Sequence, residues 1–131
     1  MQSLRNLIGV PFVDGGRDYI HGLDCWGMLL EVYKRNGIIL PDYKIIAFDS
    51  PAIYHNMEAV KQYWKPTQSP KCLTVISFAI DPYYPTFTQH FGVCLDEKKF
   101  IHTRLKTGGV VEDINAPFWS KKRTGYWEWR G

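Results

Sequence analysis

The chain has 131 residues, 45% of them hydrophobic and 15% aromatic, and its formal net charge at pH 7 is +3. This length supports one hydrophobic core, so we expect a single domain over residues 1–131. The basic residues are scattered and form no dense basic face, which argues against a nucleic-acid-binding protein. The most apolar stretch, residues 73–80, is too short to span a bilayer, and the N-terminus lacks the apolar run of a secretory signal. We therefore expect a soluble chain made in the cytoplasm, with no membrane as partner.

The first half of the chain favours helices. A short helix over 4–8 is indicated by apolar residues at helical spacing and ends at Gly9. A longer helix over 25–36 ends before Gly37, and its apolar face includes Cys25, Met28, Leu29, Val32 and Tyr33. A further helix begins with Ser50 as cap, and its apolar residues are Ile53, Met57, Val60 and Trp64.

The second half of the chain favours strands separated by turn segments. The predicted strands cover residues 73–80, 89–95, 100–104, 109–112 and 125–129. Helices followed by antiparallel strands predict an α+β fold. We expect the sheet to pack on the helix that carries the first cysteine.

Cys25 stands where a glycine-rich loop leads into a helix. The unpaired N–H groups and the dipole of a helix N-terminus favour negative charge, which lowers the pKa of a thiol there and makes it a better nucleophile. The same N–H groups can hold the oxyanion that forms when a carbonyl is attacked. A cysteine in this position can also be an ordinary small core residue, so the partner residues must decide.

A nucleophilic cysteine needs an imidazole to accept its proton and a third group to orient that imidazole. Two of the histidines, on a loop and a helix, are expected at the surface, whereas His90 and His102 fall on predicted strands. A three-residue turn at 96–98 would pair Gly92 with His102 and make the two histidines diagonal neighbours on one face of the sheet. A two-residue turn would place them on opposite faces. The hypothesis of a Cys25, His90, His102 site therefore depends on this register.

A zinc site is the alternative use of the same residues together with Cys94. These residues lack the closely spaced ligand pair that is typical of zinc sites. We therefore expect neither a metal nor a cofactor.

Two stretches of the chain carry a resemblance to a known family. They are LIGVPFVDGGRDYIHGLDCWGMLLEVYKRNGIILPDY, residues 7–43, and HFGVCLDEKKFIHT, residues 90–103. They resemble the NlpC family of bacterial cell-wall cysteine peptidases, a small branch of the papain-like fold. The glycine loop before Asp-Cys-Trp-Gly, the His-x-Gly strand and a second histidine twelve residues later are motifs of that family in its order. The resemblance implies a papain-like NlpC-type fold, with N-terminal helices packed on an antiparallel β-sheet.

By this resemblance Cys25 is the nucleophile, His90 is the base and His102 is the residue that orients it. The family cleaves amide bonds in peptidoglycan stem peptides, typically between D-γ-glutamate and the diamino acid, so a stem peptide is the implied substrate. Asp24 would help to recognise polar groups of that substrate. It is equally suited to cap the helix, and the two roles are compatible.

The chain departs from the family pattern near the expected substrate cleft. Phe12 stands where many members have a tyrosine, and Tyr19 is the candidate to supply the missing hydroxyl. Trp26 replaces the commoner serine and would narrow or reshape the cleft. We therefore expect Asp24, Trp26, Phe12 and Tyr19 to form the substrate-binding set.

The Asp-Cys-Trp-Gly form, followed by residues 37–43, is similar to family members encoded in phage tail modules. It implies association with the virion tail and other tail proteins as partners. The alternative is a tail-tip structural or assembly protein that keeps the fold with little or no hydrolysis. The intact set of Cys25, His90 and His102 argues against that alternative, because an unused site has no need of all three.

Overall fold

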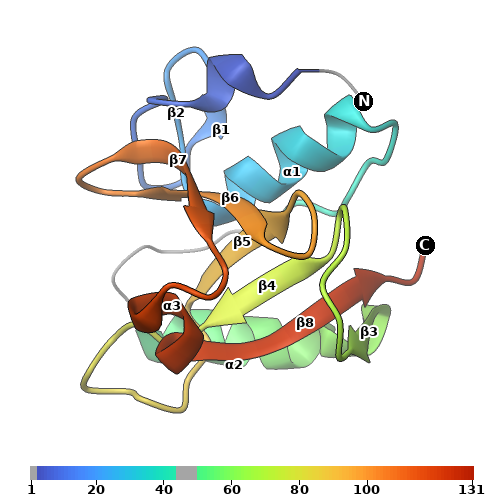
Figure 1. Ribbon diagram of the computed structural model, residues 1–131, viewed down its shortest axis with the longest axis vertical. Coiled ribbons are helices and arrows are strands. Elements are labelled where there is room, and N and C mark those ends of the chain that lie inside the picture. The colour runs from blue at the N-terminus through green and yellow to red at the C-terminus, as the bar shows by residue number, and fades with distance from the viewer. Residues whose placement is uncertain (1–2, 44–49) are drawn as a thin grey trace.

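The computed structural model describes residues 3–43 and 50–131 (Figure 1). Near the N-terminus lie a 3-10 helix, Arg5–Leu7, the short strands β1 (Arg17–Asp18) and β2 (Gly22–Leu23), and the helix α1 (Cys25–Arg35). The middle of the chain holds α2 (Ser50–Val60), a second 3-10 helix (Lys61–Tyr63), β3 (Trp64–Thr67) and β4 (Val75–Phe78). Then follow β5 (His90–Cys94), β6 (Lys99–Arg104), β7 (Gly108–Asp113), α3 (Pro117–Lys122) and β8 (Arg123–Trp129).

The main sheet is antiparallel and six-stranded, in the order β3-β8-β4-β5-β6-β7. Strands β4 to β7 follow one another as a meander, and β8 returns to lie between β3 and β4. In Figure 1, α1 lies against β5 and β6, and α2 lies behind β4 and β8. This arrangement confirms the predicted α+β fold and the packing of the sheet on the cysteine-bearing helix.

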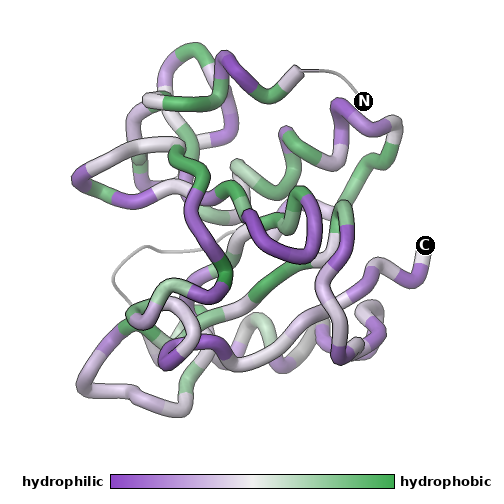
Figure 2. Tube along the Cα trace, in the orientation of Figure 1, coloured by the Kyte–Doolittle hydropathy of each residue, from purple (hydrophilic) through white to green (hydrophobic). Residues whose placement is uncertain are grey.

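Helix α1 begins where the sequence predicts and ends at Arg35, one residue before the predicted end at Asn36. The side chain of Asp24 caps its N-terminus by accepting a hydrogen bond from the Gly27 N–H group (2.8 Å). Gly37 follows the helix with a φ of 80°, in the left-handed region that favours glycine. Met28, Leu29 and Val32 are at most 1% exposed, and Figure 2 shows the hydrophobic stretches along α1 and the central strands. The helix is therefore held by the burial of one apolar face.

The two faces of the sheet bury different sets of side chains. Val75, Val93 and Ile101 pack in the cluster that includes the apolar face of α1. A second cluster contains the alternate strand positions Ile76, Phe78, Cys94 and Phe100, together with Ile114 after β7 and the α3 residue Trp119. Both faces of β5 are thus covered, which explains why every residue of this strand is buried.

The hairpin between β5 and β6 has the register on which the predicted site depends. Val93 pairs with Ile101, and the Leu95 N–H group donates to the Lys99 carbonyl (2.8 Å), which leaves a three-residue turn over 96–98. The carboxylate of Asp96 stabilises this turn by accepting the Lys98 and Lys99 N–H groups (2.7 and 2.8 Å). The structure therefore confirms the predicted turn.

The structure differs from the predicted elements in three places: the predicted helix over 4–8 is the 3-10 turn Arg5–Leu7, the sequence does not predict the elements β1, β2 and α3, and the region around Trp64 folds differently. The sequence predicts this residue on the helix that begins at Ser50, but α2 ends at Val60, whose side chain lies outside the described residues, and Trp64 opens β3. Trp64 pairs with Trp129 on β8, and their rings pack 5.0 Å apart. Pairing with a strand distant in sequence overrides the helical spacing here.

None of the helices in the described ranges is long and apolar enough to cross a membrane.

Candidate active site

Cys25 is the first residue of α1 and is only 6% exposed. The glycine-rich loop packs so closely on this first turn that a Cβ atom on Gly27 would collide with the Gly16 carbonyl oxygen. Glycine at position 27 therefore allows the loop to lie over the start of the helix.

One oxygen of the Asp24 carboxylate is hydrogen-bonded, and the other is buried without a partner among the described residues. Oδ1 accepts hydrogen bonds from the Gly27 N–H group and from Nη1 of Arg17 (2.6 Å), whereas Oδ2 is buried with no hydrogen-bond partner among the described residues. The cap expected from the sequence is thus confirmed, and Arg17 is an ion partner that sequence reasoning missed. Arg17 also binds Asp42 (2.8 Å), so it ties the loop to the segment after α1.

The environment of Cys25 corrects one expectation about its acidity. Burial raises the pKa of its thiol to about 12, and the Asp24 carboxylate adds to the rise. Hydrogen bonds from backbone N–H groups and the charge of Arg17 lower the pKa, but they do not offset the burial. The loss of water around the thiol raises its pKa by more than the helix dipole, which is equivalent to roughly half a charge, lowers it. Cys25 therefore rests as a neutral thiol and needs a base to become a nucleophile.

The two strand histidines form a hydrogen-bonded pair. Nε2 of His90 lies 2.7 Å from Nδ1 of His102, and Nε2 of His102 lies 2.5 Å from a carboxylate oxygen of Glu112 on β7. Trp119 packs against both imidazoles, with ring centroids 6.0 and 4.8 Å away. The pair is thus held between two strands and one tryptophan.

Both imidazoles are neutral at pH 7. Burial lowers the pKa of His90 well below 6.5, and repulsion from the Arg104 charge, and from His102 when it is protonated, adds to the effect. Burial, again with Arg104 nearby, lowers the pKa of His102 to about 3. The contact between His102 and Glu112 is therefore a hydrogen bond from a neutral ring.

A cavity of about 310 Å³ brings most of the predicted site residues together. Cys25 and His90 both line it, and Asp24 and Phe12 lie in the same wall. His102 reaches this site through its hydrogen bond to His90. A neutral thiol and a neutral imidazole in one cavity can exchange a proton once a substrate is bound.

Trp26 lies in the core, which corrects the expectation that it shapes the cleft. It is 2% exposed, its Nε1 donates to the Pro41 carbonyl (3.1 Å), and its ring packs edge-on against Trp64 and Phe91. It lines a separate, mostly apolar cavity with Trp127. Successive helical residues project about 100° apart, so the residue after Cys25 points toward the core.

Tyr19 also lies away from the cavity that Cys25 and His90 line. It belongs to the loop between β1 and β2, and its ring packs against the Arg35 guanidinium (4.9 Å to the ring centroid). It lines a surface cavity with Glu31 and Lys34 instead. The expectation that Tyr19 supplies the missing hydroxyl is therefore corrected, because the short β-ladder turns this loop toward the outer side of α1.

Arg104 and Glu112 are two further residues of the site that sequence reasoning missed. Arg104 lines the cavity of Cys25 and His90, and its guanidinium lies over the rings of Phe118 and Trp119 (5.6 and 5.2 Å). Within residues 3–43 and 50–131, no carboxylate forms an ion pair with it. Glu112 stands opposite Phe100 and is a diagonal neighbour of His102. Diagonal neighbours on adjacent strands lie within reach of each other, and the reasoning that joins His90 to His102 could also have identified Glu112 from the sequence.

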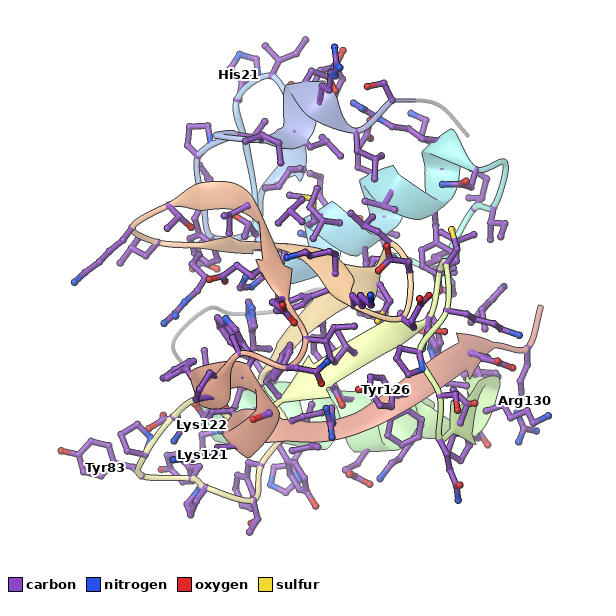
Figure 3. The ribbon with its side chains drawn as sticks, in the orientation of Figure 1. His21, Tyr83, Lys121, Lys122, Tyr126 and Arg130 are labelled. Atoms are coloured by element: carbon purple, nitrogen blue, oxygen red, sulfur yellow. The ribbon has the colours of Figure 1, made fainter. Side chains whose placement is uncertain are left out.

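The other two histidines lie on the surface. His21 is 82% exposed and binds Asp18, and Figure 3 shows it at the outer end of its loop. His55 is exposed on α2. In the described part of the chain, no group of three or more His, Cys, Asp or Glu side chains is placed to hold a metal ion.

The helix α1 starts with Cys25 and packs on an antiparallel sheet, and Cys25 shares a cavity with His90 from that sheet. This arrangement is that of a papain-like fold. The sequence model of the NlpC/P60 family matches residues 9–128. The chain belongs to the NlpC/P60 family.

Relatives of known structure have the same fold. An NLP/P60 family protein from Staphylococcus aureus subsp. aureus Mu50, described as similar to a lipoprotein, matches with a TM-score of 0.69 at 20% identity, over 95% of this chain and 38% of that one. The NlpC/p60 domain of the peptidoglycan hydrolase SagA matches with a TM-score of 0.62 at 19% identity, over 95% and 91% of the two chains.

One curated relative is the Gamma-DL-glutamyl hydrolase of Bacillus subtilis strain 168. It is 25% identical over 131 residues, which cover 95% of this chain and 27% of that protein. The chain thus spans about a quarter of the length of this relative.

Proposed function

We propose that residues 1–131 form one NlpC-type catalytic domain, a cysteine peptidase that hydrolyses amide bonds in peptidoglycan stem peptides. The observation that carries the proposal is that Cys25 and His90 line one cavity while His102 holds His90 by a hydrogen bond. Family membership supports a hydrolase. The names of two relatives, a Gamma-DL-glutamyl hydrolase and a peptidoglycan hydrolase, support the substrate class.

The proposed reaction begins from the neutral state of both groups. His90 accepts the proton of the Cys25 thiol as the thiolate attacks the amide carbonyl carbon. The imidazolium of His90 then donates this proton to the leaving amine as the C–N bond breaks. Water, activated by the same imidazole, hydrolyses the thioester and restores the thiol. Because proton transfer to His90 accompanies the attack, the proposed reaction needs no preformed thiolate from a thiol with a high pKa.

We assign the scissile bond to the γ-carboxyl of a D-glutamate residue, before a diamino acid. A γ-linked glutamate keeps a free α-carboxylate, so a site for it needs a cation near the nucleophile. Arg104 supplies that cation, because it lines the cavity and its guanidinium is held by two aromatic rings with no ion-pair partner among the described carboxylates. The free Oδ2 of Asp24 is suited to accept an N–H group of the substrate. Phe12 contributes an apolar wall.

Association with a phage tail stays a prediction that rests on the Asp-Cys-Trp-Gly motif. The buried position of Trp26 gives that motif a packing role, because the tryptophan joins α1 to the aromatic core. Tail proteins as partners and location in the virion are predictions of the same kind.

Digestion of defined muropeptides, followed by mass spectrometry, tests the proposed function. We expect the parent protein to release a fragment that ends in D-glutamate, and the Cys25→Ala variant to release none. A muropeptide with an α-linked glutamate serves as the matched substrate control and should stay intact. If parent and Cys25→Ala are equally inert on muropeptides of several wall types, the assembly alternative replaces the enzyme.

A further inference from the structure

Glu112 stands at the end of a chain of hydrogen bonds that leads toward the cavity. Its carboxylate contacts Nε2 of His102 (2.5 Å), and Nδ1 of the same ring contacts Nε2 of His90 (2.7 Å). The links come from three neighbouring strands, β7, β6 and β5. Both imidazoles are at most 5% exposed, whereas the Glu112 side chain is 36% exposed. The solvent-facing end of the chain is therefore an acid and the inner end is an imidazole in the cavity.

The donor and acceptor roles along these hydrogen bonds follow from the chemistry of the Glu112 carboxylate. A carboxylate can only accept hydrogen bonds, and a neutral imidazole has one N–H donor and one acceptor nitrogen. Nε2 of His102 must therefore carry the hydrogen, which leaves Nδ1 of His102 as an acceptor. Nε2 of His90 must then be the donor. The remaining nitrogen, Nδ1 of His90, holds a free lone pair.

We propose that Glu112 is a positioning residue that sets the tautomers of both histidines and so makes Nδ1 of His90 the base of the site. The inference rests on the proposed function, in which the Cys25 thiol is the proton donor. Within residues 3–43 and 50–131, Nδ1 of His90 makes no hydrogen bond, because the contact with His102 uses Nε2. It is thus available to the thiol.

The histidine pair alone does not select this arrangement. In the reversed chain, Nδ1 of His102 donates to Nε2 of His90, and the second hydrogen of the pair sits on Nδ1 of His90. The hydrogen bond between the rings is equally good, but a protonated Nδ1 cannot accept a proton from the thiol. Glu112 separates the two arrangements, because the reversed chain would point a lone pair of His102 at a carboxylate.

The catalytic step balances without a proton reaching Glu112. The S–H bond of Cys25 breaks, an N–H bond forms at Nδ1 of His90, and the ring becomes an imidazolium that keeps its Nε2 hydrogen. The negative charge of Glu112, relayed through His102, favours this cation, while Arg104 opposes it. When the leaving amine takes the proton from Nδ1, His90 becomes neutral again and the hydrogen bonds among Glu112, His102 and His90 return to their resting arrangement.

The tautomers can be measured in the resting protein by long-range ¹H–¹⁵N correlation spectra of the imidazoles at pH 7. In the parent protein we expect hydrogen on Nε2 and a lone pair on Nδ1 in both His90 and His102. In Glu112→Lys the ammonium can only donate, so both histidines should carry hydrogen on Nδ1 instead. Asp113→Asn, on the same strand but paired with Lys99 (3.7 Å), is the matched control and should keep the parent spectrum.

Activity gives a second readout that a purely structural role would not move. If circular dichroism shows an unchanged fold, Glu112→Lys should lower kcat by roughly 10- to 100-fold with little change in KM. The substrate contacts stay, but hydrogen on Nδ1 of His90 prevents this nitrogen from acting as the base. Hydrogen on Nδ1 of His90 in the parent would overturn the proposal, as would parent tautomers in a folded Glu112→Lys variant. If that variant does not fold, the parent spectrum decides.

The spectra need no substrate, so the two proposals fail separately. If the parent cleaves no muropeptide but shows the expected tautomers, the proposed function fails and the role of Glu112 in setting the tautomers stands. If it cleaves muropeptides with hydrogen on Nδ1 of His90, the function stands and the role of Glu112 is rejected.

Discussion

Nε2 of His90 and Nδ1 of His102 lie 2.7 Å apart inside the molecule, under the ring of Trp119. The register of the hairpin brings them together, because Val93 pairs with Ile101 and puts both histidines on one face of the sheet. Since both rings are neutral and buried, we expect their contact to affect both the proposed catalysis and the pH dependence of stability.

The first prediction ranks three substitutions by their effect on muropeptide cleavage. His90→Ala should abolish activity as fully as Cys25→Ala, because residues that act as a unit are strongly non-additive. His102→Ala should leave measurable activity, and His102→Gln should retain more, because its amide oxygen can still accept the His90 N–H. Rates on one muropeptide, with folding checked by circular dichroism, establish the order. Higher activity in His90→Ala than in His102→Ala would refute the assignment of the base.

The second prediction concerns stability in mild acid. An unfolded histidine takes up a proton near pH 6.5, but the folded pKa of His102 is about 3 and that of His90 is also well below 6.5. Below pH 6.5 the unfolded chain thus binds more protons than the folded chain, so stability is full above this pH and falls as the pH drops toward the folded pKa values. We expect a loss of roughly 1 kcal/mol per pH unit for each buried histidine.

Urea unfolding between about pH 7.5 and pH 5 measures this slope, since ordinary carboxylates stay ionised over that range. His102→Gln should remove about half of the slope. His21→Gln changes an exposed histidine and should leave the slope unchanged. An equal slope in the parent and in His102→Gln would contradict the neutral, buried state of that ring.

The third prediction is that alkylation of Cys25 depends on His90. The thiol of Cys25 is buried with a pKa raised to about 12, so its reactive thiolate must form by proton transfer to the imidazole. Peptide mapping after brief iodoacetamide treatment should show slower labelling of Cys25 in His90→Ala than in the parent. Cys72 is exposed and provides the internal control, because its labelling should be fast and equal in both proteins. Equal labelling of Cys25 in both would mean that His90 does not activate it.

The fourth prediction tests Arg104 as the binding partner of the α-carboxylate. Arg104→Gln should raise KM on a γ-D-glutamyl peptide by roughly 10- to 100-fold, because the ion-pair hydrogen bond to the α-carboxylate is lost. A peptide whose α-carboxylate is amidated should be a poor substrate of the parent and should be affected little by the same substitution. Lys121→Gln removes an exposed charge on α3 and should change neither KM. If Arg104→Gln weakens both substrates equally, Arg104 does not read that carboxylate.

The local features of the site could be predicted from the sequence because they depend on nearby residues. The Asp24 cap, the position of Cys25 at the start of α1 and the left-handed Gly37 are each decided within one turn of helix. The pairing of the histidines could be predicted because one short turn decides the hairpin register.

Only the tertiary structure decided which side chains share the cavity and what charges they carry. Burial of Cys25 by loop, helix and sheet together raises the pKa of its thiol, which a helix dipole alone would lower. Trp26 and Tyr19 lie near Cys25 in sequence but outside its cavity, whereas Arg104 lines it. Burial and electrostatic environment are properties of everything packed around a group, and most of those neighbours are distant in the sequence.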